Sequence, residues 1–296
     1  MDTSDSEQYT HIDSAIGGGD RGIVARRTVR RFTAILESHF ARDQEASFGL
    51  AWQHGGSMQK SAAIEYNHDA YLCEGFAVWD DAGAKRPGIL IFPEWGGVGE
   101  YAQKRAQMLG DLGFNAFVVD VYGKGIRPNT PETCQAEMMK YATERPLLRE
   151  RARCGFDELR KVPNTDLGKL AAIGYCFGGM AVLEMARDGH NDLAGVVSFH
   201  GVLATPMGLK RDGYQGKILV LHGADDPIVP DDQTIAFWNE MRDANANWEF
   251  VTYGKAFHTF TNWLMPEDGP PPQAYNKQAD RRSWVAMQKF SKEIFA

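Results

Sequence analysis

The chain has 296 residues and a formal net charge of −7, with 43% hydrophobic and 24% charged residues. This length fits one large α/β domain with an additional segment, and the composition is that of an ordinary globular protein. The negative charge does not favour nucleic acid or an anionic membrane as a partner. No apolar run reaches the roughly 18 residues that a membrane span needs.

The N-terminal stretch and the cysteines indicate a reducing compartment. The first 20 residues are polar and acidic, unlike a signal peptide. The four cysteines form no CxxC pair and no Cys/His metal spacing, so we expect reduced thiols, no metal and a cytoplasmic location. They are Cys73, Cys134, Cys154 and Cys176.

Residues 1–57 differ from the rest and are expected to form an N-terminal extension, with the compact domain at 58–296. Residues 24–42 place Val29, Phe32, Leu36 and Phe40 on one helical stripe, with four arginines largely off it. One interpretation is a helix that docks on its own domain or on a second subunit. The alternative is a contact with a membrane or nucleic acid.

From residue 61 onwards the pattern is that of an α/β protein. Residues 62–66 and 70–80 read as an antiparallel edge hairpin, because a turn signal separates two strand-like runs. Apolar strands then alternate with helices, as expected for a mainly parallel sheet with both faces covered. Strands are expected at 88–92, 115–120, 169–175, 194–199, 217–222 and 248–253, and helices near 100–112, 131–161, after 176, at 231–244 and at 279–290.

Cys176 stands at the apex of the segment "GYCFGG", where a strand meets a helix. Gly174 and Gly178 flank it in the spacing of a nucleophile elbow, which needs a sharp turn with a strained residue at its tip. The N-terminus of the following helix favours a thiolate over a thiol. Taken alone, the motif fits a buried cysteine at a tight turn equally well.

The order of polar residues after the later strands favours catalysis. Asp225 and Asp226 follow the strand at 217–222, and His258 follows the strand at 248–253. An α/β-hydrolase carries nucleophile, acid and histidine in that order. His258 alone among the histidines comes after both the cysteine and the aspartates. Chemistry alone leaves the choice between the two aspartates open.

The segment "FPEWGGVGEY" follows the strand at 88–92, where this fold supplies an oxyanion-hole amide. The candidates are the backbone N–H groups of Trp95 and Phe177, which would face the oxygen of a tetrahedral intermediate. Glu94 is unusual there. Its carboxylate would disfavour a neighbouring thiolate, but it can also accept the thiol proton.

Residues 59–296 resemble the dienelactone hydrolase (carboxymethylenebutenolidase) family of α/β-hydrolases. The resemblance rests on "FPEWGGVGEY", "VVDVYGKG", "GYCFGG", "GADDPIVP" and "AFHTFTN". It implies Cys176 as nucleophile, His258 as base and Asp226, rather than Asp225, as the acid. It also implies that Glu94 contacts the resting thiol and helps to release it as thiolate when substrate binds.

Two positions depart from the family. Its characterised members bind a substrate carboxylate through arginines, where this chain has Gly123 and Lys124 at one position and Asn262 at the other. The candidate substrate-binding residues are therefore Tyr122, Lys124, Asn262 and Arg281. The resemblance therefore implies hydrolase activity more strongly than it implies a dienelactone substrate.

The sequence thus predicts a hydrolase of activated esters or lactones that uses a Cys-His-Asp triad and forms an acyl-thioester. The alternatives are a general carboxylesterase or thioesterase, and a non-catalytic α/β-hydrolase module used for binding. We expect a small-molecule substrate, no cofactor and no metal. Neither a membrane nor a nucleic acid is expected as partner, and the state is monomer or homodimer.

Overall fold

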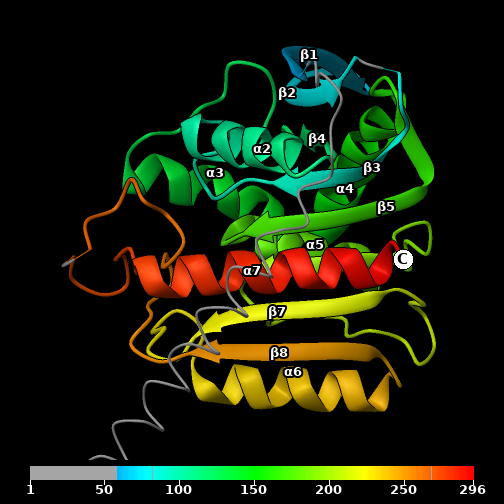
Figure 1. The fold of residues 1–296 in the computed structure, drawn as a ribbon. Helices are drawn as coiled ribbons and strands as arrows, with labels where there is room; N and C mark the ends of the chain where they lie inside the picture. Colours follow the sequence, from blue (N-terminus) through cyan, green and yellow to red (C-terminus); the bar gives the residue numbers. More distant parts are fainter. Residues whose placement is uncertain (1–58, 82, 268) are drawn as a thin grey trace, which may run out of the picture. The chain divides into compact units, whose positions relative to one another are not determined.

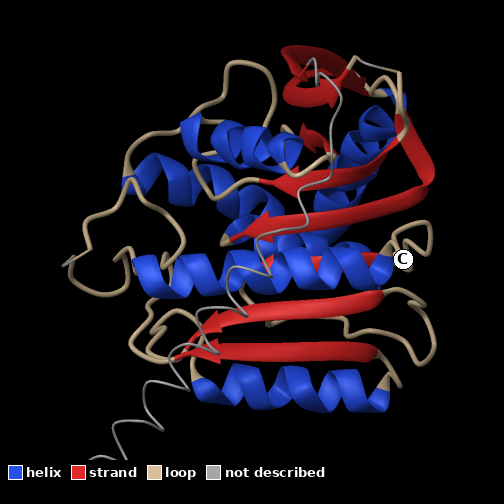
Figure 2. Cartoon of the chain, viewed as in Figure 1, coloured by secondary structure: helices blue, strands red, loops and turns tan. Residues whose placement is uncertain are grey.

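The structure is a computed structural model and describes residues 59–81, 83–267 and 269–296 (Figure 2). The helix expected within residues 24–42 and the boundary at residue 57 lie outside this part. No helix in the described ranges is long and apolar enough to cross a membrane.

One eight-stranded sheet forms the centre of the domain, in the order β1-β2-β4-β3-β5-β6-β7-β8 (Figure 1). β1 pairs antiparallel with β2 and β2 with β4, whereas all other pairs are parallel. This confirms the mainly parallel sheet with an antiparallel N-terminal edge hairpin. The strands are β1 (Gln59–His68), β2 (Tyr71–Asp80), β3 (Arg86–Phe92), β4 (Asn115–Val118), β5 (Thr165–Tyr175), β6 (Gly195–Phe199), β7 (Lys217–Gly223) and β8 (Asn247–Tyr253).

Helices cover both faces of the sheet. α2 (Glu100–Asp111) and α7 (Lys277–Ile294) pack on one face, while α4 (Arg145–Lys161), α5 (Phe177–Arg187) and α6 (Asp231–Asp243) pack on the other. α3 (Pro131–Thr143) packs on α4. Successive residues of β3 serve opposite cores: Leu90 and Phe92 face α4 and α5, and Ile89 and Ile91 face α2. This two-sided burial explains why residues 89–92 of the strand are all apolar.

The long helix expected over 131–161 is in fact two helices. α3 ends at Thr143, Glu144 leaves helical geometry with ψ of 71°, and α4 starts at Arg145. Pro146 accounts for the break, because in a continuous helix its ring would clash with the carbonyl four residues earlier and it supplies no N–H for the helical hydrogen bond. The break places Arg145 at the start of a helix.

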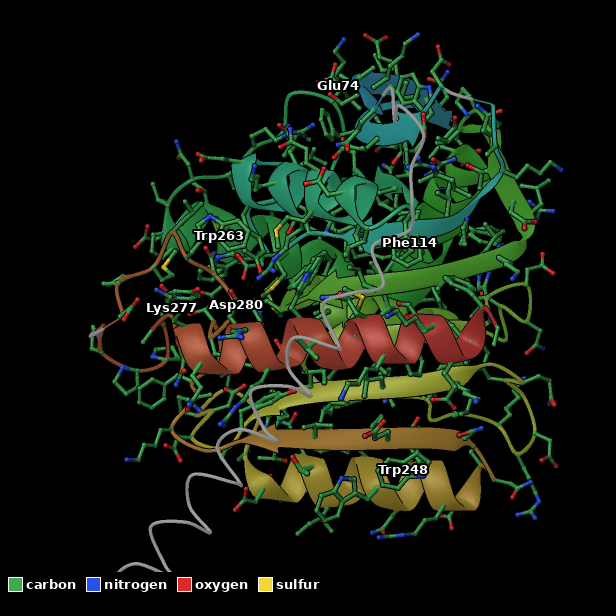
Figure 3. All side chains as sticks on the ribbon, in the orientation of Figure 1. Glu74, Phe114, Trp248, Trp263, Lys277 and Asp280 are labelled. Atoms are coloured by element: carbon green, nitrogen blue, oxygen red, sulfur yellow. The ribbon has the colours of Figure 1, made fainter. Side chains whose placement is uncertain are left out.

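A buried cation fixes α2 to α7. Arg105 on α2 is 1% exposed, forms an ion pair with Asp280 on α7 and donates to the carbonyl oxygen of Thr261. Its guanidinium lies 4.5 Å from the ring centre of Trp263 and 5.0 Å from that of Trp284. Trp263 and Asp280 both lie near the start of α7 (Figure 3). The charge is therefore compensated by a carboxylate, a carbonyl and aromatic faces.

Replacing Arg105 should destabilise the domain more than replacing an exposed residue of the same helix. We expect R105M to lower the free energy of unfolding by about 3–5 kcal/mol, because Asp280 would remain largely buried without its cationic partner. R105M/D280N should recover part of the loss. Urea unfolding would measure both, with K104M on the exposed face of α2 as the control. Equal stabilities of R105M and K104M would contradict this role of Arg105.

Candidate active site

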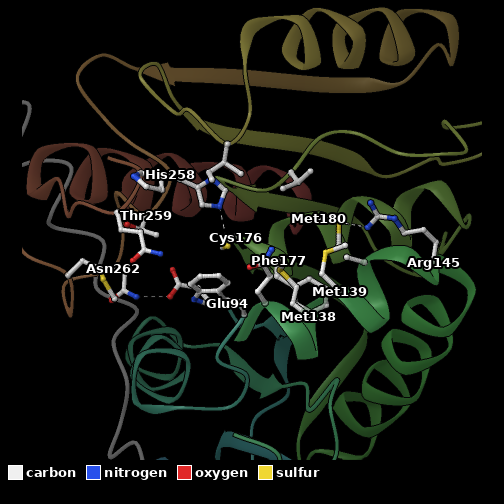
Figure 4. A pocket seen from close by; sticks show the side chains of 18 residues that line it. Glu94, Met138, Met139, Arg145, Cys176, Phe177, Met180, His258, Thr259 and Asn262 are labelled. Carbon is white, nitrogen blue, oxygen red and sulfur yellow. Dashed lines mark hydrogen bonds between the residues drawn. The ribbon is translucent and has the colours of Figure 1, made fainter. Parts of the chain in front are cut away.

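A cavity of about 510 Å³ opens beyond the carboxyl ends of the parallel strands (Figure 4). Its wall is mostly apolar, with a few polar groups at one side, as is usual for small-molecule sites. The lining residues come from the loops after β3, β6, β7 and β8, from the turn after β5 with the start of α5, and from the α3–α4 region. They are Glu94, Trp95, Gln135, Met138, Met139, Ala142, Arg145, Cys176, Phe177, Met180, Val202, Ile228, His258, Thr259, Asn262, Met265, Pro272 and Gln273.

Cys176 occupies the one-residue turn between β5 and α5. Its backbone has φ of 55° and ψ of −115°, a strained conformation for a residue with a side chain. A Cβ on Gly174 would lie 1.9 Å from the carbonyl oxygen of Gly178, and one on Gly178 would lie 2.2 Å from that of Phe92. Both glycines are therefore required by close backbone approach, and the turn presents the thiol at the cavity.

The structure brings Cys176, His258 and Asp226 together. Nε2 of His258 lies 3.1 Å from Sγ of Cys176, and Nδ1 of His258 lies 2.8 Å from Oδ2 of Asp226. The other oxygen of Asp226 accepts the backbone N–H of Ile228 at 2.8 Å. Since a carboxylate only accepts, Nδ1 carries a proton and Nε2 faces the sulfur. Asp225 is exposed, so Asp226 is the aspartate that orients the imidazole.

The surroundings of His258 favour its charged form. Burial opposes the charge, but the Cys176 sulfur and the Asp226 carboxylate outweigh burial and raise the pKa of His258 to about 10. An imidazolium beside Sγ stabilises a thiolate by charge attraction. The contact thus places a charged imidazole N–H within reach of the cysteine sulfur.

Glu94 is held by Asn262 rather than by the thiol. Nδ2 of Asn262 donates to Oε2 of Glu94 at 2.6 Å, while the buried Oε1 has no hydrogen-bond partner among the described residues. The expected contact between Glu94 and the thiol is not formed here, since Cys176 contacts His258. Burial raises the pKa of Glu94 to about 7, against the lowering effects of Asn262, His258 and Arg105. Glu94 can therefore take up or release a proton near neutral pH.

Trp95 and Phe177, the residues expected to supply the oxyanion-hole N–H groups, both line the cavity. Phe177 is the first residue of α5, so its N–H has no partner within the helix. Trp95 follows Glu94 in a turn that closes from Gly97 N–H to Glu94 O at 2.9 Å. Tyr122 does not line the cavity. Its hydroxyl donates to the Trp95 carbonyl at 2.9 Å and its ring stacks on Phe177, so Tyr122 contacts both of these residues.

A second histidine, His200, supports the site from behind. The N–H of Cys176 is shared between the carbonyl of Phe199 at 3.0 Å and Nδ1 of His200 at 3.1 Å. Nδ1 therefore accepts, and Nε2 carries the proton toward the hydroxyl of Thr261 at 2.7 Å. Burial, then the charges of His258 and Arg105, hold the pKa of His200 well below its usual value. The strand-end position of His200 was visible in the sequence, but its contacts were not.

Two of the expected substrate-binding cations lie away from the cavity. Lys124 is exposed and forms ion pairs with Glu65 of β1 and Glu74 of β2. Arg281 is exposed on α7 and is absent from the cavity wall. Instead, Arg145 lines the cavity. No spacing in the sequence singled it out, because it precedes Cys176 by a whole helix and strand.

The described residues contain no group of three or more His, Cys, Asp or Glu side chains that could hold a metal ion.

Comparisons with known proteins agree with this geometry. A sequence profile of the dienelactone hydrolase family matches residues 74–295. The chain belongs to the dienelactone hydrolase family. A crystal structure described as a dienelactone hydrolase-like promiscuous phosphotriesterase, from metagenomic libraries, is 36% identical with a TM-score of 0.76; the match covers 81% of this chain and 100% of that one.

Two further relatives match at similar identity. A structure named m3DLH is 35% identical over 81% of this chain and 100% of its own, with a TM-score of 0.77. An uncharacterised protein of Caenorhabditis elegans, K02A2.1, is 36% identical over 50% of this chain and 95% of its own. As a member of this family, the chain is a hydrolase with the α/β-hydrolase fold.

The charge on His258 should depend on Cys176. In C176A the largest group that raises the pKa of His258 is gone, so this pKa should fall clearly below its value of about 10 in the parent. NMR titration of the His258 ring would measure the shift, with C154A as a control, because Cys154 lies outside the cavity wall. An unchanged pKa in C176A would rule out the paired thiolate and imidazolium.

Glu94 should cost the fold stability at high pH. Its pKa of about 7 lies above its ordinary value of 4.5, so the folded state binds the proton more tightly than the unfolded chain does. Stability from this group is therefore lost as pH rises from about 4.5 to 7. E94Q should gain about 2–3 kcal/mol over the parent between pH 5 and pH 8.

Urea unfolding of E94Q and the parent at both pH values would measure this gain. E100Q, a change at an exposed glutamate at the start of α2, is the control. If the free energies of unfolding of E94Q and the parent differ by the same amount at pH 5 and at pH 8, the pKa of Glu94 is not raised above that of a surface carboxylate.

Proposed function

We propose that this hydrolase cleaves activated carboxylic esters or lactones through a covalent acyl-thioester on Cys176. The observation that carries the proposal is the contact of His258 with both Cys176 Sγ, at 3.1 Å, and Asp226, at 2.8 Å. A nucleophile in reach of a base that a third group orients is the arrangement used in nucleophilic catalysis.

The first half of the reaction forms the acyl-enzyme. The Cys176 thiolate attacks the carbonyl carbon, and the amides of Trp95 and Phe177 stabilise the oxyanion. When the carbon–oxygen bond breaks, the His258 imidazolium gives its Nε2 proton to the leaving oxygen. The products are an alcohol or enol, a thioester and a neutral His258.

The second half releases the acid. Neutral His258 takes a proton from water, the hydroxide attacks the thioester, and the tetrahedral intermediate expels the thiolate beside the renewed imidazolium. Asp226 keeps the ring in one orientation during both halves. Glu94, which lines the same cavity and has a pKa of about 7, is proposed to exchange a proton as substrate enters.

Thiolate chemistry also narrows the substrates. A thiolate is easily expelled from the tetrahedral adduct, so acylation succeeds only where the other leaving group departs readily. Activated esters, enol lactones and thioesters meet this condition, and amides do not. Lys124 is exposed and paired with Glu65, and Asn262 is bonded to Glu94, so neither of these two positions offers an arginine or lysine to a carboxylate close to the scissile bond.

A second candidate is hydrolysis of neutral phosphotriesters. The relative at 36% identity is described as a promiscuous phosphotriesterase, and the same thiolate could attack phosphorus. Cleavage of carboxylic esters is preferred, because the two amide donors suit a carbonyl oxygen. General carboxylesterase or thioesterase activity would use the same catalytic groups. A purely binding role does not require the contacts of His258 with Cys176 and Asp226.

The four cysteines are unpaired in the structure. A reducing compartment would keep Cys176 usable as a thiol, so a cytoplasmic location is part of the proposal.

Turnover of p-nitrophenyl acetate tests the nucleophile. C176A should lose about 10³-fold or more in kcat, as when a triad nucleophile is removed, while C154A should keep parental turnover. H258A should accumulate an acetylated protein visible by mass spectrometry, because nitrophenolate leaves without a proton but the thioester then lacks its base. Parental rates in C176A would refute the proposed mechanism.

A panel of neutral lactones, dienelactones, short esters and a phosphotriester would then rank the substrates. We expect no advantage for lactones that carry a carboxylate on or next to the ring.

A further inference from the structure

The cavity holds one cation that the proposed reaction does not use. Arg145 is the first residue of α4 and the only lysine or arginine among the cavity-lining residues. Its side chain lies at one end of the cavity, with Met180, Met138 and Met139 between it and Cys176 (Figure 4).

The guanidinium of Arg145 has few partners of its own. Nη2 donates to the carbonyl oxygen of Ala204 at 3.3 Å, Nη1 contacts the sulfur of Met180, and the buried Nε has no acceptor among the described residues. A guanidinium carries five N–H donors, so most of its hydrogen-bonding capacity is unused.

No carboxylate in the described part of the chain pairs with Arg145. Glu184 is the acid nearest in electrostatic effect, but its oxygens accept from Arg149 at 2.8 Å and from Arg187 at 3.1 Å. Burial lowers the pKa of Arg145, and the charges of Arg187 and Arg149 act in the same direction. An arginine still stays protonated, so this half-buried charge lacks a counter-ion.

The position of Arg145 sets the shape of a ligand that could supply the counter-ion. The N–H of Met180 donates to the carbonyl of Cys176 at 3.2 Å, so Met180 lies one helical turn, about 5.4 Å, along α5. Arg145 lies beyond Met180. A ligand that reaches from the sulfur to the guanidinium must therefore cross a methionine-lined wall, which suits a flexible apolar chain.

We propose that Arg145 forms an anion subsite at the far end of the cavity, and that preferred substrates are esters or thioesters whose apolar part ends in a carboxylate. The inference rests on the proposed function for the reacting end of the substrate. It differs from the carboxylate grip that the family resemblance implied, because that grip belongs to the positions of Lys124 and Asn262, close to the scissile bond.

Two series of substrates test the subsite in the full chain. One consists of p-nitrophenyl monoesters of linear dicarboxylic acids of increasing length, and the other of acetates whose alcohol ends in a carboxylate. Each is compared with its methyl-capped neutral partner. The parent should prefer the acid by about tenfold or more in kcat/KM at an intermediate length, as for a charge-assisted contact.

Matched variants locate the effect. R145M should abolish the preference by raising KM for the acids relative to their neutral partners, since methionine keeps the apolar wall but removes the charge. R145K should retain part of it. R153M, at an exposed arginine of the same helix that pairs with Asp188, should behave like the parent. Rising salt should weaken the preference in the parent only modestly, because the site is partly buried.

Ligand binding to C176A, which should be inactive, tests the subsite independently of the reaction. Octanoate should bind C176A more tightly than octanol does, and C176A/R145M should lose the difference, as measured by calorimetry. The subsite is refuted if neither series shows an acid preference, or if R145M keeps it. If C176A turns over esters normally while octanoate still needs Arg145, the subsite stands and the proposed mechanism fails.

Discussion

The hydrogen bonds that join His258 to Cys176 and Asp226 depend on the parallel arrangement of β5, β7 and β8. Each of the three residues follows the carboxyl end of a different strand. Strands that run in the same direction end at one edge, so side chains separated by 82 positions in the chain come within hydrogen-bond reach. The rest of the site is arranged around this contact, and no single loop would suffice to form it.

The strain at Cys176 is compensated by its surroundings. A positive φ at a residue with a side chain costs of order 1–3 kcal/mol, and it persists only where neighbouring groups fix the backbone. Here, the Cys176 N–H is held by the Phe199 carbonyl and by His200. His200 is held in turn by Thr261, whose carbonyl receives the buried Arg105. The ion pair that fixes α7 to α2 is thus linked by continuous contacts to the nucleophile, which ties local geometry at the cavity to the stability of the fold.

Much of this arrangement could be predicted from the sequence, because it follows from periodicity and order. Apolar runs gave the strands, and the succession of cysteine, aspartate and histidine identified the three residues that the structure brings together. The break at Glu144 was missed, although Pro146 was a visible signal. The partners of Lys124 were missed because ion pairs across a hairpin depend on register: Glu65 and Glu74 face each other only once β1 and β2 are aligned.

Arg145 is a cavity residue that the order of polar residues along the chain does not identify. A triad is read from residues that follow strands, whereas Arg145 enters the cavity from a helix start that exists only because the chain breaks before Pro146. Its importance lies in what is missing around it: an arginine in an apolar wall whose neighbouring acid is already committed to two other arginines. Sequence patterns record which groups are present, but an uncompensated charge is a property of the packed molecule. For that reason, the substrate preference of this hydrolase is better sought at the far end of its cavity than in the motif that carries its nucleophile.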